Sequence, residues 1–155
     1  MRMEARSVYS TQYEDELRYV VTCITNQTSV RLIETIVDTG AKYTCYQAAF
    51  IDDTLVENDM LDHQSMDIGG FVDGDERKNT VRFYRYPVKQ FTIGSIDVGA
   101  RDVWITFDKR VKDNVLGLDV LQSVSFLQLD NEKELLFFKD RAELKGYVSQ
   151  ITVQI

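Results

Sequence analysis

The sequence predicts an all-β domain with one or two short helices. Segments rich in Val, Ile, Thr, Tyr and Phe recur along the 155 residues, and turn-forming residues separate them. There is one proline, and no repeat or low-complexity run marks a linker. A composition of 44% hydrophobic and 28% charged residues is typical of a globular protein with a buried core. We therefore expect a single domain over residues 1–155, with its core at about residues 18–140.

Six segments have the composition of strands. The first four are Arg18–Thr25, Val30–Val37 and residues 80–86 and 102–107. The last two, Ser125–Leu129 and Glu134–Phe138, are separated by the turn residues 130–133, which predicts an antiparallel hairpin. A second hairpin turn is predicted at residues 73–75, because an Asp-Gly pair follows two glycines and a phenylalanine.

Helical patterning is limited to two short stretches, residues 48–60 and 118–124, where apolar residues recur at three- and four-residue spacing. The end of the chain, residues 147–155, alternates instead, with Ile151, Val153 and Ile155 on one side. Such alternation predicts a strand with one buried face. A terminal apolar strand needs a partner, either in its own sheet or on another subunit.

The charge balance restricts the classes of partner. The chain has 25 acidic and 18 basic residues, a formal net charge of −7, and its basic residues form no long cluster. Binding to a phosphate backbone needs clustered cations, so we expect no nucleic-acid partner. No apolar run approaches the roughly 20 residues that cross a bilayer. No apolar stretch follows the charged first residues either, so we expect no membrane partner, no secretory signal and a cytoplasmic location.

The residues that carry chemistry follow the second predicted strand. The apolar segment Val30–Val37 runs directly into Asp38-Thr39-Gly40-Ala41. A carboxylate at the end of a buried strand has to be hydrogen-bonded, paired or protonated, because burying a lone anion is costly. Gly40 permits a tight turn in which its amide approaches the carboxyl group. The alternative interpretation is a plain β-turn with a solvated aspartate.

Two further motifs occur downstream in the chain, Ile68-Gly69-Gly70-Phe71 and Val115-Leu116-Gly117-Leu118. Together with Asp38-Thr39-Gly40-Ala41, and in this order, they make the sequence resemble the retropepsin-like aspartic proteases. This family includes the retroviral proteases and small bacterial homologues. The resemblance extends over about residues 21–138. It implies a closed β-barrel, the acid protease fold, and an aspartic endopeptidase without metal or other cofactor.

The resemblance also implies that one chain supplies half of an active site. The sequence contains one Asp-Thr-Gly, so a two-fold homodimer would contribute Asp38 twice. The two carboxyl groups would share a proton and activate the water that attacks a peptide bond. Thr39 would brace the loop of the partner subunit. Leu116 and Gly117 would pack under the Asp38 loop, with Gly117 allowing close backbone approach.

Residues 66–75 would form a flap over an extended polypeptide substrate, which would bind as an added strand. The residues implied in substrate binding are Ala41, Ile68, Gly69, Gly70 and Phe71. The charged segment 72–79 also fits an ordinary hairpin turn. In retroviral members the terminal strands interleave, so we expect residues 147–155 at the dimer interface.

Several residues allow other interpretations. Lys42 stands where the family often has Ser, Thr or Asp; we expect it to point to solvent, whereas an inward ammonium would favour ionisation of the catalytic carboxylate. A dyad of Cys45 with His63, the single histidine, is disfavoured against a buried cysteine and a surface histidine. The acidic residues 52–59 lack the glycine and glutamate of a calcium loop, which favours a solvated helix face. The alternatives for the whole chain are a catalytically silent retropepsin-like domain that binds extended peptides or dimerises, and a β-barrel module in which the motif is coincidental.

Overall fold

The chain folds mainly into strands. The computed structural model describes residues 6–9, 18–27, 29–60, 64–71, 79–129 and 134–154. Its strands are β1 (Arg6–Tyr9), β2 (Arg18–Thr25), β3 (Val30–Val37), β4 (Cys45–Gln47), β5 (Ser65–Gly69), β6 (Thr80–Ile93), β7 (Ile96–Thr106), β8 (Val115–Leu116), β9 (Ser125–Leu129) and β10 (Glu134–Phe138). Its helices are α1 (Ala48–Ile51), the 3₁₀ turn η1 (Glu57–Asp59), α2 (Leu118–Leu121) and α3 (Arg141–Gln154).

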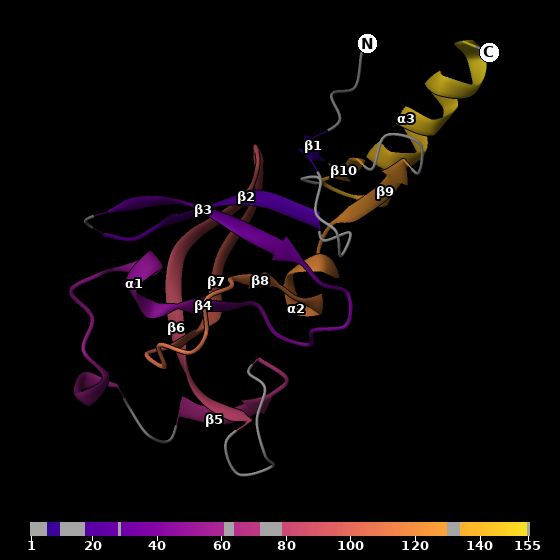
Figure 1. The fold of residues 1–155 in the computed structure, drawn as a ribbon. Coiled ribbons are helices and arrows are strands. Elements are labelled where there is room, and N and C mark those ends of the chain that lie inside the picture. Colours follow the sequence, from indigo (N-terminus) through magenta and orange to yellow (C-terminus); the bar gives the residue numbers. More distant parts are fainter. Residues whose placement is uncertain are drawn as a thin grey trace.

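Seven strands form the larger sheet, in the order β2-β3-β8-β4-β7-β6-β5. β2 also pairs with β6, so the pairings that run from β2 through β3, β8, β4, β7 and β6 return to β2. Most pairs are antiparallel, but β3 with β8 and β4 with β7 are parallel. The long β6 and β7 curve through the whole sheet (Figure 1), and their register shifts between Val88 and Phe91. A bulge of this kind lets one strand bend and reach two neighbours.

The main core is formed by side chains of this sheet together with side chains of α1, α2 and β10. Its largest wholly buried side chains include Tyr46, Phe91, Phe137, Ile24, Ile33, Ile51, Ile93 and Ile105. Three hydroxyl groups are buried among them: the Thr22 hydroxyl lies 2.8 Å from that of Tyr46 and 2.9 Å from that of Thr35. These groups satisfy one another, which removes most of the cost of burying them. Burial raises the pKa of Tyr46, so its hydroxyl stays neutral.

A smaller antiparallel sheet, in the order β1-β10-β9, lies at one end of the larger sheet (Figure 1). Leu135 and Phe137 of β10 belong to the main core, which joins the two sheets. α3 packs on the other side of β10, where the rings of Phe138 and Tyr147 lie 5.3 Å apart between centroids. The far end of α3 extends away from the larger sheet (Figure 1).

The predicted strands are confirmed, two of them with longer bounds. Arg18–Thr25 and Val30–Val37 are β2 and β3. Residues 80–86 fall within β6, which continues past Pro87 to Ile93. Residues 102–106 fall within β7, which ends at Thr106, one residue before the predicted end. Pro87 still pairs with Asp102, and the register of β6 and β7 shifts only after Val88. The hairpin of β9 and β10 is antiparallel as predicted. Its turn and the turn at 73–75 lie outside the described residues.

The prediction of a terminal strand at residues 147–155 is wrong, because α3 extends to Gln154. Asp140 Oδ1 accepts the N–H of Glu143 at 2.9 Å, and Glu143 Oε2 accepts the N–H of Lys139 at 3.3 Å. This arrangement resembles a capping box, and Ala, Glu, Leu and Lys in the first turns favour a helix. The β-branched residues that follow cost less than about 0.7 kcal/mol each in a helix. Residues 147–154 therefore supply no strand to a dimer interface.

The prediction of a helix over residues 48–60 is also wrong, because the helix is much shorter. α1 ends at Ile51, and only the short turn η1 follows. Asp52 has an extended backbone, and its Oδ1 accepts the amide of Thr54 at 2.9 Å and the hydroxyl of Thr54 at 2.6 Å. Such local bonds compete with the helix and end it. The acidic residues therefore lie largely in turns rather than on a helix face, and α2 similarly covers only part of residues 118–124.

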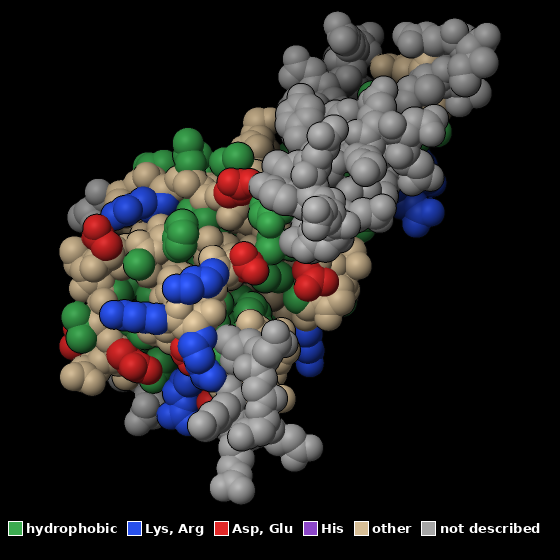
Figure 2. Space-filling view, viewed as in Figure 1, with side chains coloured by type: hydrophobic (Ala, Val, Ile, Leu, Met, Phe, Trp, Pro, Cys, Tyr) green, Lys and Arg blue, Asp and Glu red, His purple; other side chains and the backbone are tan. Residues whose placement is uncertain are grey.

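Acidic and basic side chains are interspersed over the described residues of the face in Figure 2. Two ion pairs join neighbouring strands: Arg82 lies 3.2 Å from Asp67, and Arg85 lies 3.8 Å from Asp102. These pairs are exposed, so each contributes little to stability. Within the described part of the chain, no helix is both long enough and apolar enough to span a membrane.

Replacing the cap of α3 tests the assignment of this helix. Asp140→Ala removes the acceptor for Glu143 N–H and should destabilise α3 by about 1 kcal/mol. Faster hydrogen exchange of the α3 amides, with unchanged exchange in β2 and β3, is the expected result. Asp140→Asn is the matched control, since asparagine caps equally well. Equal exchange in wild type and Asp140→Ala would contradict the capping role.

Candidate active site

The Asp38 loop begins where β3 ends. Asp38 N–H donates to the carbonyl of Leu116 at 3.1 Å, which continues the pairing of β3 with β8. The loop then turns back on itself: Gly40 N–H donates to Asp38 Oδ1 at 2.8 Å, and Ala41 N–H donates to the Asp38 carbonyl at 3.1 Å. Asp38, Thr39 and Gly40 are all exposed in the single chain. One carboxylate oxygen is thus held by the turn while the side chain stays accessible.

The segment after β8 lies against the backbone of this loop. Leu118 N–H donates to the carbonyl of Ala41 at 2.8 Å. A Cβ atom on Gly117 would lie 2.4 Å from the carbonyl oxygen of Tyr43 and 2.9 Å from that of Ala41. Any residue other than glycine would force the two backbones apart. Gly117 and Leu116 therefore lie directly beneath the Asp38 loop.

Thr44 and Asp119 join the loop to α2 by side-chain hydrogen bonds. The Thr44 hydroxyl donates to Asp119 Oδ1 at 2.6 Å and accepts the N–H of Gly117 at 3.0 Å. Asp119 Oδ2 accepts the N–H of Thr44 at 3.1 Å, and Oδ1 also accepts the N–H of Val120 at 2.8 Å. Thr44 is wholly buried, so these bonds replace those that water would make. They fix the loop relative to the start of α2.

Further polar residues hold the ends of β8 and α2. Asn114 is buried; its side-chain oxygen accepts Gln47 N–H at 2.9 Å and its carbonyl accepts Ile36 N–H at 2.8 Å. Arg101 of β7 donates to the carbonyl of Asp119 at 2.7 Å. The sequence analysis missed Asn114, Asp119 and Arg101 as supporting residues. Polar residues at both ends of the apolar segment 115–118 were a signal for the first two, whereas Arg101 gives no local signal.

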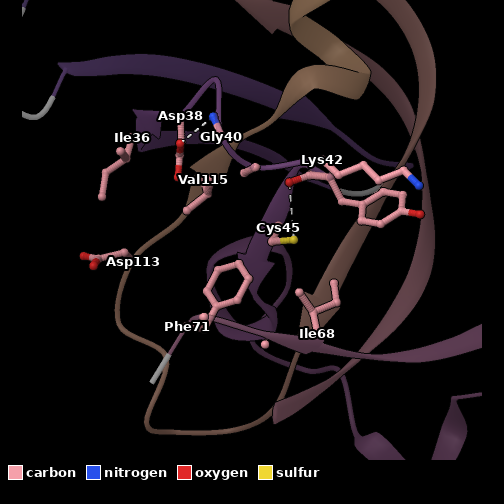
Figure 3. A pocket seen from close by; sticks show the side chains of 13 residues that line it. Ile36, Asp38, Gly40, Lys42, Cys45, Ile68, Phe71, Asp113 and Val115 are labelled. Carbon is pink, nitrogen blue, oxygen red and sulfur yellow. Dashed lines mark hydrogen bonds between the residues drawn. The ribbon is translucent and has the colours of Figure 1, made fainter. Parts of the chain in front are cut away.

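A cavity of about 480 Å³ opens beside the Asp38 carboxylate (Figure 3). Its walls contain seven of the predicted site residues: Asp38, Gly40, Ala41, Ile68, Gly69, Gly70 and Phe71. Ile36, Lys42, Tyr43, Cys45, Asp113 and Val115 line it as well. Three predicted residues are not on its wall: Thr39 is exposed beside it, and Leu116 and Gly117 lie beneath the loop. The fold thus brings the Asp-Thr-Gly loop and the Gly-Gly segment to one cavity.

The predicted flap begins as a paired strand. β5 is antiparallel to β6, with Gly69 opposite Thr80. Gly70 has a positive φ of 90°, a conformation that favours glycine. The Phe71 ring packs on Phe83, 4.9 Å between centroids, and so anchors this side of the cavity. Residues 72–78, which would complete the flap or an ordinary turn, lie outside the described residues.

Lys42 and Cys45 line the same cavity without reaching the Asp38 carboxylate. The Lys42 ammonium is exposed, lies 5.4 Å from the centre of the Tyr43 ring and points away from Asp38 (Figure 3), as expected. The buried Cys45 thiol faces the carbonyl of Tyr43 at 3.5 Å. Burial, and secondarily the charge of Asp119, raises the pKa of Cys45, so its thiol is not a nucleophile near neutral pH. His63 lies outside the described residues.

The chain has no match among protein-family models or curated proteins, but solved structures resemble it. A retropepsin-like aspartic protease from Rickettsia conorii is 15% identical, with a TM-score of 0.50 over 90% of this chain and 95% of that one. The EIAV protease, solved in complex with the inhibitor HBY-793, is 18% identical, with a TM-score of 0.44 over 72% of this chain and 91% of that one. The likeness to the Rickettsia protein shows that the chain has the retropepsin-like fold, so the predicted all-β class is confirmed.

Substitution of Gly117 tests the backbone contact under the loop. Gly117→Ala places a methyl group against two carbonyl oxygens and should lower the free energy of unfolding by about 3 kcal/mol, the upper end for overpacking. Urea denaturation measures this loss. Gly69→Ala is the control, because no atom lies within 4 Å of the added Cβ, and its effect should stay below about 1 kcal/mol. Similar stability of both variants would show that the loop does not depend on the contact.

Substitution of Thr44 tests the hydrogen bonds to α2. Thr44→Val keeps the volume but leaves Gly117 N–H without its acceptor, so stability should fall by about 1–3 kcal/mol. Thr54 donates to Asp52 with the same 2.6 Å geometry but is exposed. Thr54→Val should therefore cost less than about 0.5 kcal/mol. If thermal or urea unfolding showed the same loss of stability in Thr44→Val and Thr54→Val, burial of Thr44 would not strengthen its hydrogen bonds.

Proposed function

We propose that this chain is an aspartic endopeptidase that acts as a homodimer, with one Asp38 from each subunit. The observation that carries the proposal is the single cavity lined by Asp38 together with Gly69 and Gly70. The fold it shares with the Rickettsia protease, which is named as an aspartic protease, supports the same conclusion.

A single Asp38 is an incomplete catalyst for this reaction. Hydrolysis of a peptide needs one group to take a proton from water and another to donate a proton to the carbonyl oxygen. In the described residues, the other aspartate in the cavity wall is Asp113, which lies on a separate loop and has no Thr-Gly turn. A two-fold axis beside Asp38 would supply a second, identical carboxyl group. Thr39, exposed next to Asp38, would then contact the loop of the partner subunit.

The proposed mechanism needs no covalent intermediate. Two carboxyl groups in contact share one proton, because like charges at such short distance cannot both ionise. The ionised group takes a proton from water as the oxygen attacks the carbonyl carbon, while the protonated group donates to the carbonyl oxygen. The first carboxyl group then gives its proton to the amide nitrogen as the C–N bond breaks, while a hydroxyl group of the tetrahedral intermediate returns a proton to the second carboxylate, so the dyad again holds one proton. The extended polypeptide would lie between the Asp38 loop and the Gly69-Gly70 segment, bound by main-chain hydrogen bonds.

The first experiment compares two aspartates in matched turns. Asp38→Asn keeps the acceptor for Gly40 N–H but removes the titratable group, so peptide cleavage should fall about 10²- to 10⁴-fold. Asp97 accepts Gly99 N–H at the same 2.8 Å and lies outside the cavity, so Asp97→Asn should retain activity. Mass spectrometry of products from an unfolded protein substrate measures cleavage. No cleavage by wild type would favour a catalytically silent domain, and full activity of Asp38→Asn would exclude this mechanism.

A mixing experiment tests whether two chains build one site. With nine parts of Asp38→Asn to one part of wild type, random pairing leaves about one wild-type chain in ten with a wild-type partner. Activity per wild-type chain should then fall about tenfold relative to wild type alone. The same excess of Asp97→Asn should cause no fall. Unchanged activity with the Asp38→Asn excess would mean that a single chain carries the whole site.

A further inference from the structure

We infer that Asp113 makes the cavity selective for a substrate side chain that is long, apolar along its length and positively charged at its end, namely Lys or Arg. The inference rests on the proposed function, because it names the substrate class of the same cavity. Asp113 has no place in the mechanism above, and the sequence motifs did not single it out.

Asp113 combines exposure with a position on the cavity wall. It precedes Asn114 in the loop between β7 and β8, and its side chain is exposed, whereas the neighbouring wall residues Ile36 and Val115 are buried and apolar. Figure 3 shows Asp113 on the same side of the cavity as Ile36, with its carboxylate directed outward, away from the ring of Phe71. The cavity therefore has an apolar wall at Ile36 and Val115, with an exposed carboxylate at its rim.

The charge of Asp113 is not neutralised by the cations near it in the chain. Lys109 and Lys112 line a different cavity, together with Phe50 and Phe107. Arg110 binds Asp108, with 2.6 Å between Nη2 and Oδ2, and this pairing holds the pKa of Asp108 below its usual range. Lys42, the one cation among the described residues of the wall, is directed over Tyr43 and away from Asp38.

A basic side chain matches both the apolar wall and the carboxylate at its rim. The methylene groups of Lys or Arg can lie along Ile36 and Val115, while the charged head remains partly solvated at Asp113. Arg can bind the carboxylate through two parallel hydrogen bonds. A Glu side chain would meet the negative charge of Asp113 and, nearby, the proton-sharing Asp38 pair, which disfavours it. In a homodimer each half carries one Asp113, so the selectivity extends to both sides of the cleaved bond.

The test uses sets of fluorogenic peptides that differ only in having Lys, norleucine or Glu at one position. That position is moved over the three residues on each side of a bond that wild type cleaves. Wild type should cleave a Lys peptide about fivefold better than its norleucine counterpart at one or more positions, judged by kcat/KM, with the difference mainly in KM. Asp113→Asn should abolish this preference, and Asp113→Lys should reverse it in favour of Glu. Asp97→Asn removes the same charge outside the cavity and should keep the wild-type ratio.

The outcomes separate this inference from the proposed function. Wild type that cleaves peptides without preferring Lys, or whose preference survives both Asp113→Asn and Asp113→Lys, overturns the role of Asp113 and leaves the protease proposal intact. Wild type that cleaves none of the peptides, nor any unfolded protein, overturns the protease proposal itself. Loss of the preference in Asp97→Asn as well would assign it to net charge rather than to the cavity.

Discussion

The position of Asp38 depends on a direct contact between two backbone segments, residues 38–44 and 116–118. The Asp38 amide donates to Leu116 and the Leu118 amide donates to Ala41, so the two segments exchange hydrogen bonds on both sides of Gly117. The two segments can lie this close together because Gly117 has no side chain: a Cβ atom there would lie 2.4 Å from the carbonyl oxygen of Tyr43. A loop held by its own backbone in this way has little freedom to move its carboxylate. The geometry of the candidate site therefore depends on main-chain packing, to which Thr44 and Asp119 add side-chain hydrogen bonds.

Next to this contact, parallel and antiparallel pairing meet at β8 in the larger sheet. β8 has two residues, and it lies between β3, to which it is parallel, and β4, to which it is antiparallel. So short a strand adds few ladder bonds, and polar side chains at its ends hold it instead. Asn114 binds Gln47, the last residue of β4, at one end, and Asp119 binds Thr44 at the other. Apolar packing of Val115 and Leu116 buries the strand, while these directional bonds determine its register.

The sequence predicted those features that depend on neighbouring residues. β2, β3 and the β9–β10 hairpin follow from strand composition and turn residues, and the Asp38, Gly69-Gly70 and Gly117 motifs are visible as local patterns. α3 was missed because the apolar alternation after Tyr147 predicts a strand, whereas the cap formed by Asp140 and Glu143 starts a helix that continues through these residues. Arg101 and Asp113 could not be assigned in advance. Their roles depend on which distant segments the fold brings beside Asp38, and no local pattern encodes that proximity.

Because Asp38 is exposed in the single chain, its charge does not oppose folding, although it would affect the association that the proposed function needs. In one chain the carboxylate has a hydrogen bond from Gly40 and remains accessible to water, so the fold incurs no penalty for a buried, unpaired charge. Such a penalty arises when two copies bring their carboxylates together, and it is relieved when the pair shares one proton. Each chain also carries a formal charge of −7, so apolar contacts and hydrogen bonds must drive any association. A stable single chain and a catalytic dimer are therefore compatible, because the electrostatic cost of the site belongs to association rather than to folding.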